Sequence, residues 1–176
     1  DKNRSSNLEM ELKPHDVLLR TGPVTLRPLT EDDWILLLAW SNDPEVLYFV
    51  EGGEVTSYSL AEVKRIYQSV SQKGFCFIIE VDEAPIGECW LQPLNVESVI
   101  EDFQDSDSRR IDLMIGEKDY WGKGFGKKVI EALTEFAFSE ENCDHVFAFI
   151  NDYNVASIRA FERVGFQLER KLKEPV

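Results

Sequence analysis

The chain has 176 residues, of which 43% are hydrophobic and 30% charged, and its formal net charge is −14. This length allows one domain with a substantial core, and the apolar content excludes a disordered chain. The acidic charge excludes nucleic acid as a general partner and fits an anionic membrane surface poorly, because both need clustered Lys and Arg. An acidic protein can instead attract cationic small molecules.

The sequence shows no sign of a membrane segment or of a metal site. No apolar run is long enough to span a membrane, and no signal peptide is visible. The three cysteines are odd in number and lack metal-ligand spacing. We therefore expect reduced thiols, a cytoplasmic protein and no bound metal.

The first part of the chain predicts an arm, a strand and two helical segments. Residues 1–22 are polar and irregular, which indicates a flexible arm before a domain over 23–176. Residues 24–28 alternate like a strand, and residues 30–40 predict a helix with acids in its first turn. A further turn of helix is expected over 44–49.

A helix, a hairpin and a long polar loop are predicted next. Ser59 and Glu62 have the spacing of a capping box, and an apolar stripe at helical spacing continues to residue 70. Residues 74–81 and 85–92 predict a hairpin. A loop as long as 93–109 is often functional in a compact domain. Its acids are Glu97, Glu101, Asp102, Asp105 and Asp107.

The segment from residue 110 to about residue 139 is the most informative part of the chain. A strand-like run over 110–115 is followed by Tyr120-Trp121-Gly122-Lys123-Gly124-Phe125-Gly126-Lys127 and an amphipathic helix. The first N–H groups of a helix have no intrahelical partner, and glycines let the backbone approach a phosphate. The strand, turn and helix together predict a site for a phosphate-bearing cofactor.

The spacing of these glycines excludes two common phosphate sites. A P-loop needs Gly-x-x-x-x-Gly-Lys-Ser/Thr, and a dinucleotide fold places Gly-x-Gly-x-x-Gly near the first strand. Neither pattern fits here. Taken alone, the glycines could also form only a flexible turn.

A second motif follows the strand expected over 145–150. It reads Asn154-Val155-Ala156-Ser157-Ile158-Arg159-Ala160-Phe161-Glu162-Arg163-Val164-Gly165-Phe166. Asn154 can cap a helix over 155–163, and Gly165 suits its left-handed end. A last strand is expected over 166–173.

The two motifs, in this order, resemble the GNAT superfamily of acetyl-CoA-dependent N-acetyltransferases. The resemblance implies one α/β (α+β) domain, a mixed central sheet flanked by helices in the order β-α-α-β-β-β-α-β-α-β. A further C-terminal strand, usual in this fold, is not supplied up to Val176 and is absent, disordered or cut off. The resemblance also implies acetyl-CoA (CoA) as cosubstrate. The residues implied for it are Met114, Ile115, Trp121, Gly122, Lys123, Gly124, Phe125, Gly126, Lys127, Asn154, Ser157 and Phe161.

The front half is similar, more narrowly, to the aminoglycoside 6′-N-acetyltransferases. The matching segments are Leu38-Ala39-Trp40, residues 46–53, Tyr58-Ser59-Leu60, Pro85-Ile86-Gly87 and residues 111–117. In those enzymes the Asp equivalent to Asp112 binds the reacting amine and is proposed as the base. An Asp within an apolar strand needs a partner, and the alternative here is a salt bridge to Arg109 or Arg110. The implied acceptor site contains Glu51, Glu54, Glu88, Trp90, Asp112, Asp152 and the acidic loop 95–107.

The chain departs from the family pattern at three places. Phe161 stands where a Tyr is common, and a phenyl ring cannot protonate the leaving thiolate. The alternatives are Tyr120, Tyr153, Ser157, a water or departure of the thiolate into solvent. Trp121 replaces the usual Gln or Arg, and Asn151-Asp152 stands near the position of an Asp-Pro pair.

Three functions are compatible with these patterns. The first is acetyl transfer to a primary amine of a cationic small molecule, such as the 6′-amine of an aminoglycoside, which implies antibiotic resistance. The second is a ribosomal-protein-type N-terminal or siderophore-type acetyltransferase. The third is a non-catalytic CoA-binding domain, which Phe161 favours. We expect a monomer or a homodimer.

Overall fold

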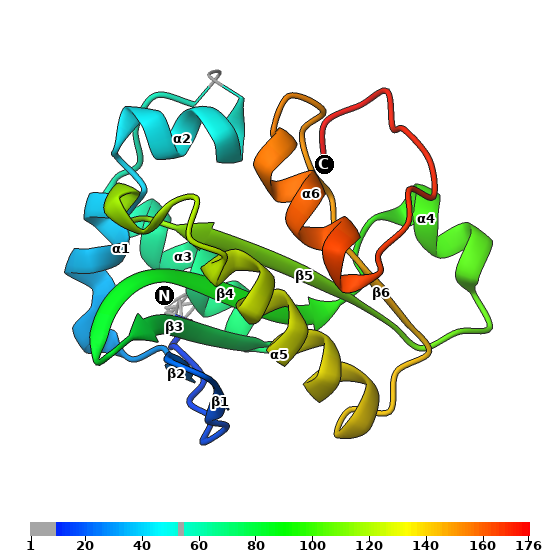
Figure 1. Ribbon diagram of the computed structural model, residues 1–176, viewed down its shortest axis with the longest axis horizontal. Coiled ribbons are helices and arrows are strands. Elements are labelled where there is room, and N and C mark those ends of the chain that lie inside the picture. The colour runs from blue at the N-terminus through cyan, green and yellow to red at the C-terminus, as the bar shows by residue number, and fades with distance from the viewer. Residues whose placement is uncertain (1–9, 53–54) are drawn as a thin grey trace, which may run out of the picture.

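The computed structural model describes residues 10–52 and 55–176, so the expected flexibility of residues 1–9 and the predicted acid Glu54 lie outside the described residues. In the described part, six strands form one sheet in the order β1-β2-β3-β4-β5-β6 (Figure 1). Neighbouring strands are antiparallel except β5 and β6, which are parallel. The expected mixed sheet flanked by helices is confirmed.

The elements follow the predicted order closely. The strands are β1 (Leu19–Thr21), β2 (Val24–Pro28), β3 (Phe75–Val81), β4 (Ala84–Pro93), β5 (Ser108–Ile115) and β6 (His145–Phe147). The helices are α1 (Trp34–Trp40), α2 (Pro44–Glu51), α3 (Leu60–Ser71), α4 (Glu97–Ile100), α5 (Phe125–Ser139) and α6 (Val155–Val164). Short 3₁₀ turns are η1 (Glu31–Asp33), η2 (Glu101–Phe103) and η3 (Lys118–Tyr120). No helix in the described ranges is long and apolar enough to cross a membrane.

Local capping explains where two of the helices begin. The Ser59 hydroxyl accepts the Glu62 N–H at 3.1 Å while the Ser59 N–H donates to the Glu62 carboxylate, so the predicted capping box starts α3. The Asn154 side chain accepts the Ser157 N–H at 3.3 Å and starts α6. Gly165 then ends α6 in the left-handed region, at φ 111°.

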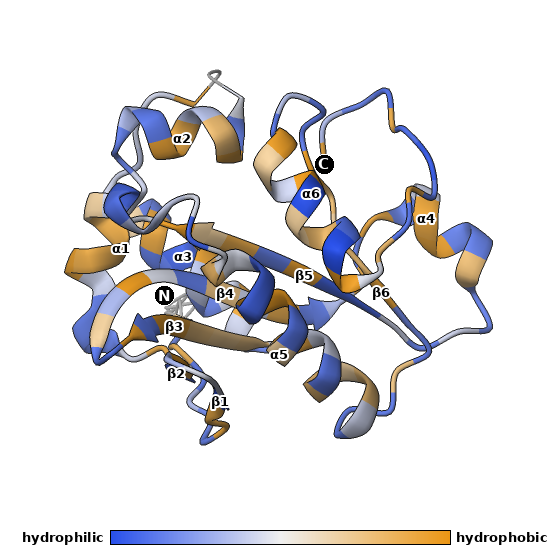
Figure 2. Ribbon diagram, viewed as in Figure 1, coloured by the Kyte–Doolittle hydropathy of each residue, from blue (hydrophilic) through white to orange (hydrophobic). Residues whose placement is uncertain are grey.

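Two hydrophobic cores lie on opposite faces of the sheet. One joins the sheet to α5 and α6, and the other joins it to α1 and α3. Successive residues of a strand point to opposite faces, so Cys89 and Ile111 enter the first core while Trp90 and Met114 lie on the second face. Figure 2 shows the hydrophobic run along β3 between these layers. By the same alternation Asp112, opposite Trp90, belongs to the α1–α3 face.

The parallel pair of strands is short. Only Ser108–Arg110 of β5 pair with His145–Phe147 of β6, so β6 ends three residues before the strand expected over 145–150. Beyond Arg110, no strand of the described chain pairs with this edge of β5. The edge therefore offers unpaired backbone groups directly before the glycine-rich turn.

The N-terminal arm and the polar loop are more ordered than predicted. Within residues 10–22, which we expected to be irregular, β1 pairs with β2, and His15 Nε2 lies 2.8 Å from the Cys76 carbonyl oxygen. The expected loop 93–109 contains α4 and η2. The contact of His15 joins distant parts of the chain, which a local pattern does not record.

The prediction of a strand over residues 166–173 is wrong. Phe166 packs edge-on against Phe161, but Leu168 is 75% exposed because no apolar layer lies next to it. Arg170 instead pairs with Asp102 at 2.5 Å, which draws the segment toward the loop that contains η2. The alternation of apolar and polar residues along 166–173 therefore predicted a strand at a place where no sheet edge pairs with it.

Candidate functional site

The glycine-rich turn has the geometry of an anion site. Gly122 and Gly124 have φ angles of 71° and 82°, in the left-handed region that glycine adopts readily. A Cβ added at either position would meet no atom within 4 Å, so the space in front of the turn is open. Gly124 is the N-cap of the 15-residue helix α5, whose first N–H groups lack helical partners. The turn therefore fits a cofactor diphosphate.

The side chains of the turn contribute less than its backbone. Lys127 Nζ lies 3.5 Å from Glu131, with both side chains 44% exposed, and Lys123 Nζ lies 5.8 Å from the Tyr120 ring centroid. Exposed contacts of this kind are weak, so both lysines can turn toward a phosphate. Phe125 packs in the core between sheet and helices, which leaves only its backbone for the cofactor.

Two tryptophans hold the connection between β5 and the turn. The Trp121 indole donates to the Ile115 carbonyl at 2.8 Å, so this predicted cofactor residue braces the turn against the strand. The Trp40 indole donates to Glu117 at 2.9 Å, and a Cβ on Gly116 would lie 2.1 Å from the Trp40 ring. Sequence reasoning missed the Trp40–Glu117 contact, because no local motif marks it.

The end of β5 can offer a cofactor its backbone alone. The Met114 side chain is 8% exposed and packs in the core with α1 and α3. Ile115 packs against the opposite core. Both predicted cofactor residues thus keep their side chains in the protein while the strand edge beside them is unpaired.

Asp112 lies at the centre of the α1–α3 face and has two partners. The Trp90 indole donates to Asp112 Oδ2 at 2.6 Å. Arg110 Nε and Nη2 donate to the two oxygens of Asp112 at 2.8 and 3.0 Å. The predicted neighbours Trp90 and Asp112 therefore meet, and the salt bridge weighed as an alternative is formed by Arg110. Arg109 pairs with Asp107 instead.

Glu88 is the buried acid of the same face. It is 5% exposed and stands opposite Met114 in the strand register, and among the described residues its Oε2 has no hydrogen-bond partner. Burial above all, and then the charge of Asp112, raise the pKa of Glu88 well above its ordinary value, although the Tyr67 hydroxyl opposes this. Glu88 therefore favours its protonated form beside Asp112.

The predicted acids Glu51 and Asp152 lie at a second place, where α2 meets the loop before α6. The Tyr153 hydroxyl donates to the Tyr48 carbonyl at 2.6 Å and bridges the two segments. Burial foremost raises the pKa of Tyr153, and the charges of Asp152 and Glu51 add to the shift. Glu51 likewise adds to the effect of burial in raising the pKa of Tyr58. The two acids thus share the surroundings of Tyr153.

Two acids of the acidic loop are paired within the protein, and the loop also places an amide beside Arg110. Asp107 and Asp102 are engaged by Arg109 and Arg170. The Asn95 side chain accepts a hydrogen bond from Arg110 Nη1 at 3.1 Å. Asn95 lies in the predicted loop, but sequence reasoning missed its contact with Arg110, because Arg110 belongs to another element.

The residues of the second motif make contacts within the protein. Asn154 caps α6 through the Ser157 N–H, which is the alternative considered for it. Phe161 is 4% exposed and packs on Phe166 in the core. The hydroxyl of Tyr153, a substitute considered for the missing acid, is bonded to α2 as described above.

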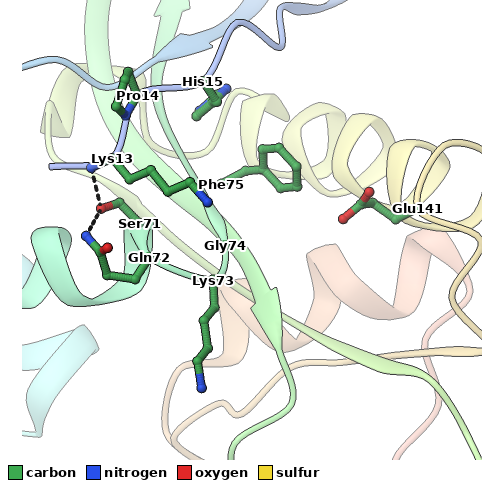
Figure 3. A pocket seen from close by; sticks show the side chains of 9 residues that line it. All are labelled: Lys13, Pro14, His15, Ser71, Gln72, Lys73, Gly74, Phe75 and Glu141. Carbon is green, nitrogen blue, oxygen red and sulfur yellow. Dashed lines mark hydrogen bonds between the residues drawn. The ribbon is translucent and has the colours of Figure 1, made fainter.

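A separate pocket of about 180 Å³ lies where the N-terminal arm crosses the end of α3 and the start of β3 (Figure 3). The residues around it are Lys13, Pro14, His15, Ser71, Gln72, Lys73, Gly74, Phe75 and Glu141. It contains none of the predicted site residues. In the described ranges no three His, Cys, Asp or Glu side chains are grouped as metal ligands. The chemistry therefore points to β5, with its turn and its Asp112 face.

Known proteins resemble this chain over most of its length. The family described as "Acetyltransferase (GNAT) domain" matches residues 24–167. Aminoglycoside N(6')-acetyltransferase type 1 of Klebsiella pneumoniae is 27% identical over 157 residues, which cover 86% of this chain and 78% of that protein.

Solved structures show the same fold. AAC(6')-Ib in complex with ribostamycin and coenzyme A has a TM-score of 0.71 at 23% identity, with 88% of each chain covered. Spermidine N-acetyltransferase from Vibrio cholerae in complex with CoA and spermine has a TM-score of 0.69 at 20% identity, with 86% of this chain and 85% of that chain covered. The match over residues 24–167 decides the family. The chain therefore belongs to the GNAT acetyltransferase family and is an acetyl-CoA-dependent N-acetyltransferase.

Proposed function

We propose that the acceptor is a primary amine of a cationic small molecule, namely the 6′-amine of an aminoglycoside antibiotic, and that the protein confers resistance. The observation that carries the proposal is the position of Asp112. It lies on the strand that leads into the cofactor turn, and Trp90 holds its carboxylate on the face opposite α5. The similarity to the Klebsiella pneumoniae enzyme over 157 residues supports this acceptor.

The cofactor half of the reaction is assigned to β5 and the turn. Acetyl-CoA supplies an acyl group activated as a thioester. Gly122 and Gly124 leave room for the diphosphate at the N-terminus of α5, and Lys123 adds positive charge. The unpaired edge of β5 at Met114 and Ile115 would hold the thioester end and polarise its carbonyl through backbone N–H groups.

The acceptor half is assigned to the carboxyl pair on β4 and β5. Asp112 would hold the acceptor ammonium through charge-assisted hydrogen bonds and take its proton before the amine attacks. Glu88, which favours its protonated form, is not assigned the role of base. Two neighbouring carboxyls with different surroundings can in this way have different roles.

The rest of a polycationic acceptor needs further acids. Glu51 and Asp152, which both influence Tyr153, would complement additional ammonium groups at the contact between α2 and the loop before α6. Phe161 is buried in the core and supplies no proton to the leaving thiolate. The thiolate would therefore be protonated by water or depart into solvent.

Calorimetry and thiol release test this proposal. Kanamycin is titrated into the protein with and without CoA, and thiol release is then followed with acetyl-CoA. We expect micromolar binding, thiol release and a product whose NMR spectrum shows acetylation at the 6′-amine. Binding of CoA without binding or acetylation of kanamycin would discard the aminoglycoside. Spermidine and peptide N-termini would then be the next acceptors to test.

A further inference from the structure

The carboxylate assigned to the acceptor amine already has a cation of its own. Arg110 pairs with both oxygens of Asp112 from two residues earlier on β5. The two side chains are only 14% and 24% exposed. A two-point pair of this kind is stronger than a single exposed contact. Asp112 is thus largely neutralised within its own strand.

Arg110 is also held from two other sides. Its Nη1 donates to Asn95 Oδ1 at 3.1 Å, and its guanidinium carbon lies 4.9 Å from the centroid of the Phe149 ring. Asn95 follows β4 and Phe149 follows β6. Three segments therefore fix the guanidinium beside Asp112, which distinguishes it from a mobile surface arginine.

Little of the Asp112 carboxylate is left for an incoming amine. A carboxylate has about four lone-pair sites, and an ammonium group donates up to about three hydrogen bonds. The Trp90 indole uses one site and Arg110 uses two. An acceptor ammonium would also meet the like charge of Arg110 at close range.

We propose that Arg110 is a resident counter-ion that a cationic acceptor must displace from Asp112 and that therefore sets the KM for the acceptor. This rests on the proposed function, because it requires Asp112 to be the amine anchor. A monoamine offers one charge in exchange for the broken pair. A polycationic acceptor gains further contacts at Glu51 and Asp152, which offset the cost of displacing Arg110.

Steady-state kinetics of Arg110→Gln and Arg109→Gln test the proposal. Arg109 is a matched control because it lies next along the strand, and its salt bridges to Asp107 and Glu141 leave Asp112 untouched. We expect KM for kanamycin to fall about fivefold in Arg110→Gln, a net change of about 1 kcal/mol, because the amine no longer has to displace a cation. KM for acetyl-CoA should stay the same, and Arg109→Gln should keep the wild-type KM for kanamycin.

Two further variants keep the proposal testable if Arg110→Gln does not fold. Phe149→Leu retains the charge but removes the ring, so KM for kanamycin should fall by a smaller factor. Arg110→Lys retains the charge without the two-point geometry. Its KM for kanamycin should lie between those of wild type and Arg110→Gln. An unchanged or raised KM for kanamycin in these variants would overturn the proposal, since Arg110 would then only position Asp112.

Failure of this inference and failure of the proposed acceptor have different signatures. A wild type that acetylates kanamycin, with no fall in KM in any variant, removes only the role of Arg110. If wild type and variants bind acetyl-CoA but neither bind nor acetylate kanamycin or spermidine, the proposed acceptor class is wrong and the role of Arg110 falls with it.

Discussion

The turn after β5 and the middle of β5 present their chemistry in different ways. After its last residue the cofactor turn relies on backbone groups, with Gly122 and Gly124 in the left-handed region and open space before them. In its middle the acceptor face relies on side chains, and Asp112 is already bonded to Trp90 and Arg110. The turn already offers open space to the proposed cofactor. The proposed acceptor face must first exchange the contact between Asp112 and Arg110 for a contact with the amine.

Because of this difference, the turn and the face should tolerate different substitutions. A turn built from backbone donors depends on the φ angles of a few residues, so exposed side chains can vary there with little effect. A face built from paired side chains depends on each charge, so one amide in place of a carboxylate changes its chemistry. Acceptor choice should therefore reside in the face, and the common cofactor in the turn.

The largest effect should come from the charge at the centre of the acceptor face. We expect Asp112→Asn to lower kcat by at least about 100-fold, because the proposed anchor and proton acceptor of the amine is lost. Affinity for acetyl-CoA should be unchanged in calorimetry. Asp82→Asn, which makes the same change in the β3–β4 turn, is the control. Unaltered turnover in Asp112→Asn would remove Asp112 as base or anchor.

The next effect should come from the backbone of the cofactor turn. Gly124→Val places a β-branched residue at φ 82°, a conformation that such residues rarely adopt, so CoA should bind about tenfold more weakly or worse. Gly124→Asn adds a Cβ but tolerates positive φ, and we expect an intermediate dissociation constant in calorimetry. Equal weakening of CoA binding in Gly124→Asn and Gly124→Val would show that crowding, rather than backbone strain, limits binding at the turn. A wild-type dissociation constant for CoA in Gly124→Val would refute the assignment of this turn to the cofactor.

The same division explains how much could be predicted from the sequence. The turn and the capping box of Ser59 and Glu62 are local patterns, and the structure contains both. The choice of Arg110 over Arg109 as the partner of Asp112 follows from the alternation of side chains along β5, which places Arg110 and Asp112 on the same face. Phe149 and Asn95 lie outside β5, so no local sequence pattern predicted their contacts with Arg110.

The error over residues 166–173 has a related cause. Alternation describes a strand by itself, but a strand also needs a neighbouring edge that accepts it. Here Leu168 has no apolar layer to enter, and Arg170 finds Asp102 in the loop before β5. Local patterns thus predicted helices and caps well and predicted pairing partners poorly.

The smallest effect tests whether the acceptor face contains one ionised carboxylate or two. Below the ordinary pKa of a Glu, both the folded and the unfolded protein hold the Glu88 proton. As pH rises above that value, Glu88 ionises first in the unfolded chain, because its folded pKa is raised. The free energy of unfolding must therefore fall with rising pH until the folded pKa is passed.

Glu88→Gln removes this pH dependence while it keeps the size of the side chain. We expect the variant to be more stable than wild type at neutral pH by about 1 kcal/mol or more, and the difference to vanish toward acidic pH. Thermal melts over a pH series measure it, and the exposed Glu169→Gln should show no such trend. A Glu88→Gln protein that is less stable at neutral pH would mean that Glu88 is ionised in the fold. The acceptor face would then hold two carboxylates against one Arg110, and an ammonium group could bind without displacing that arginine.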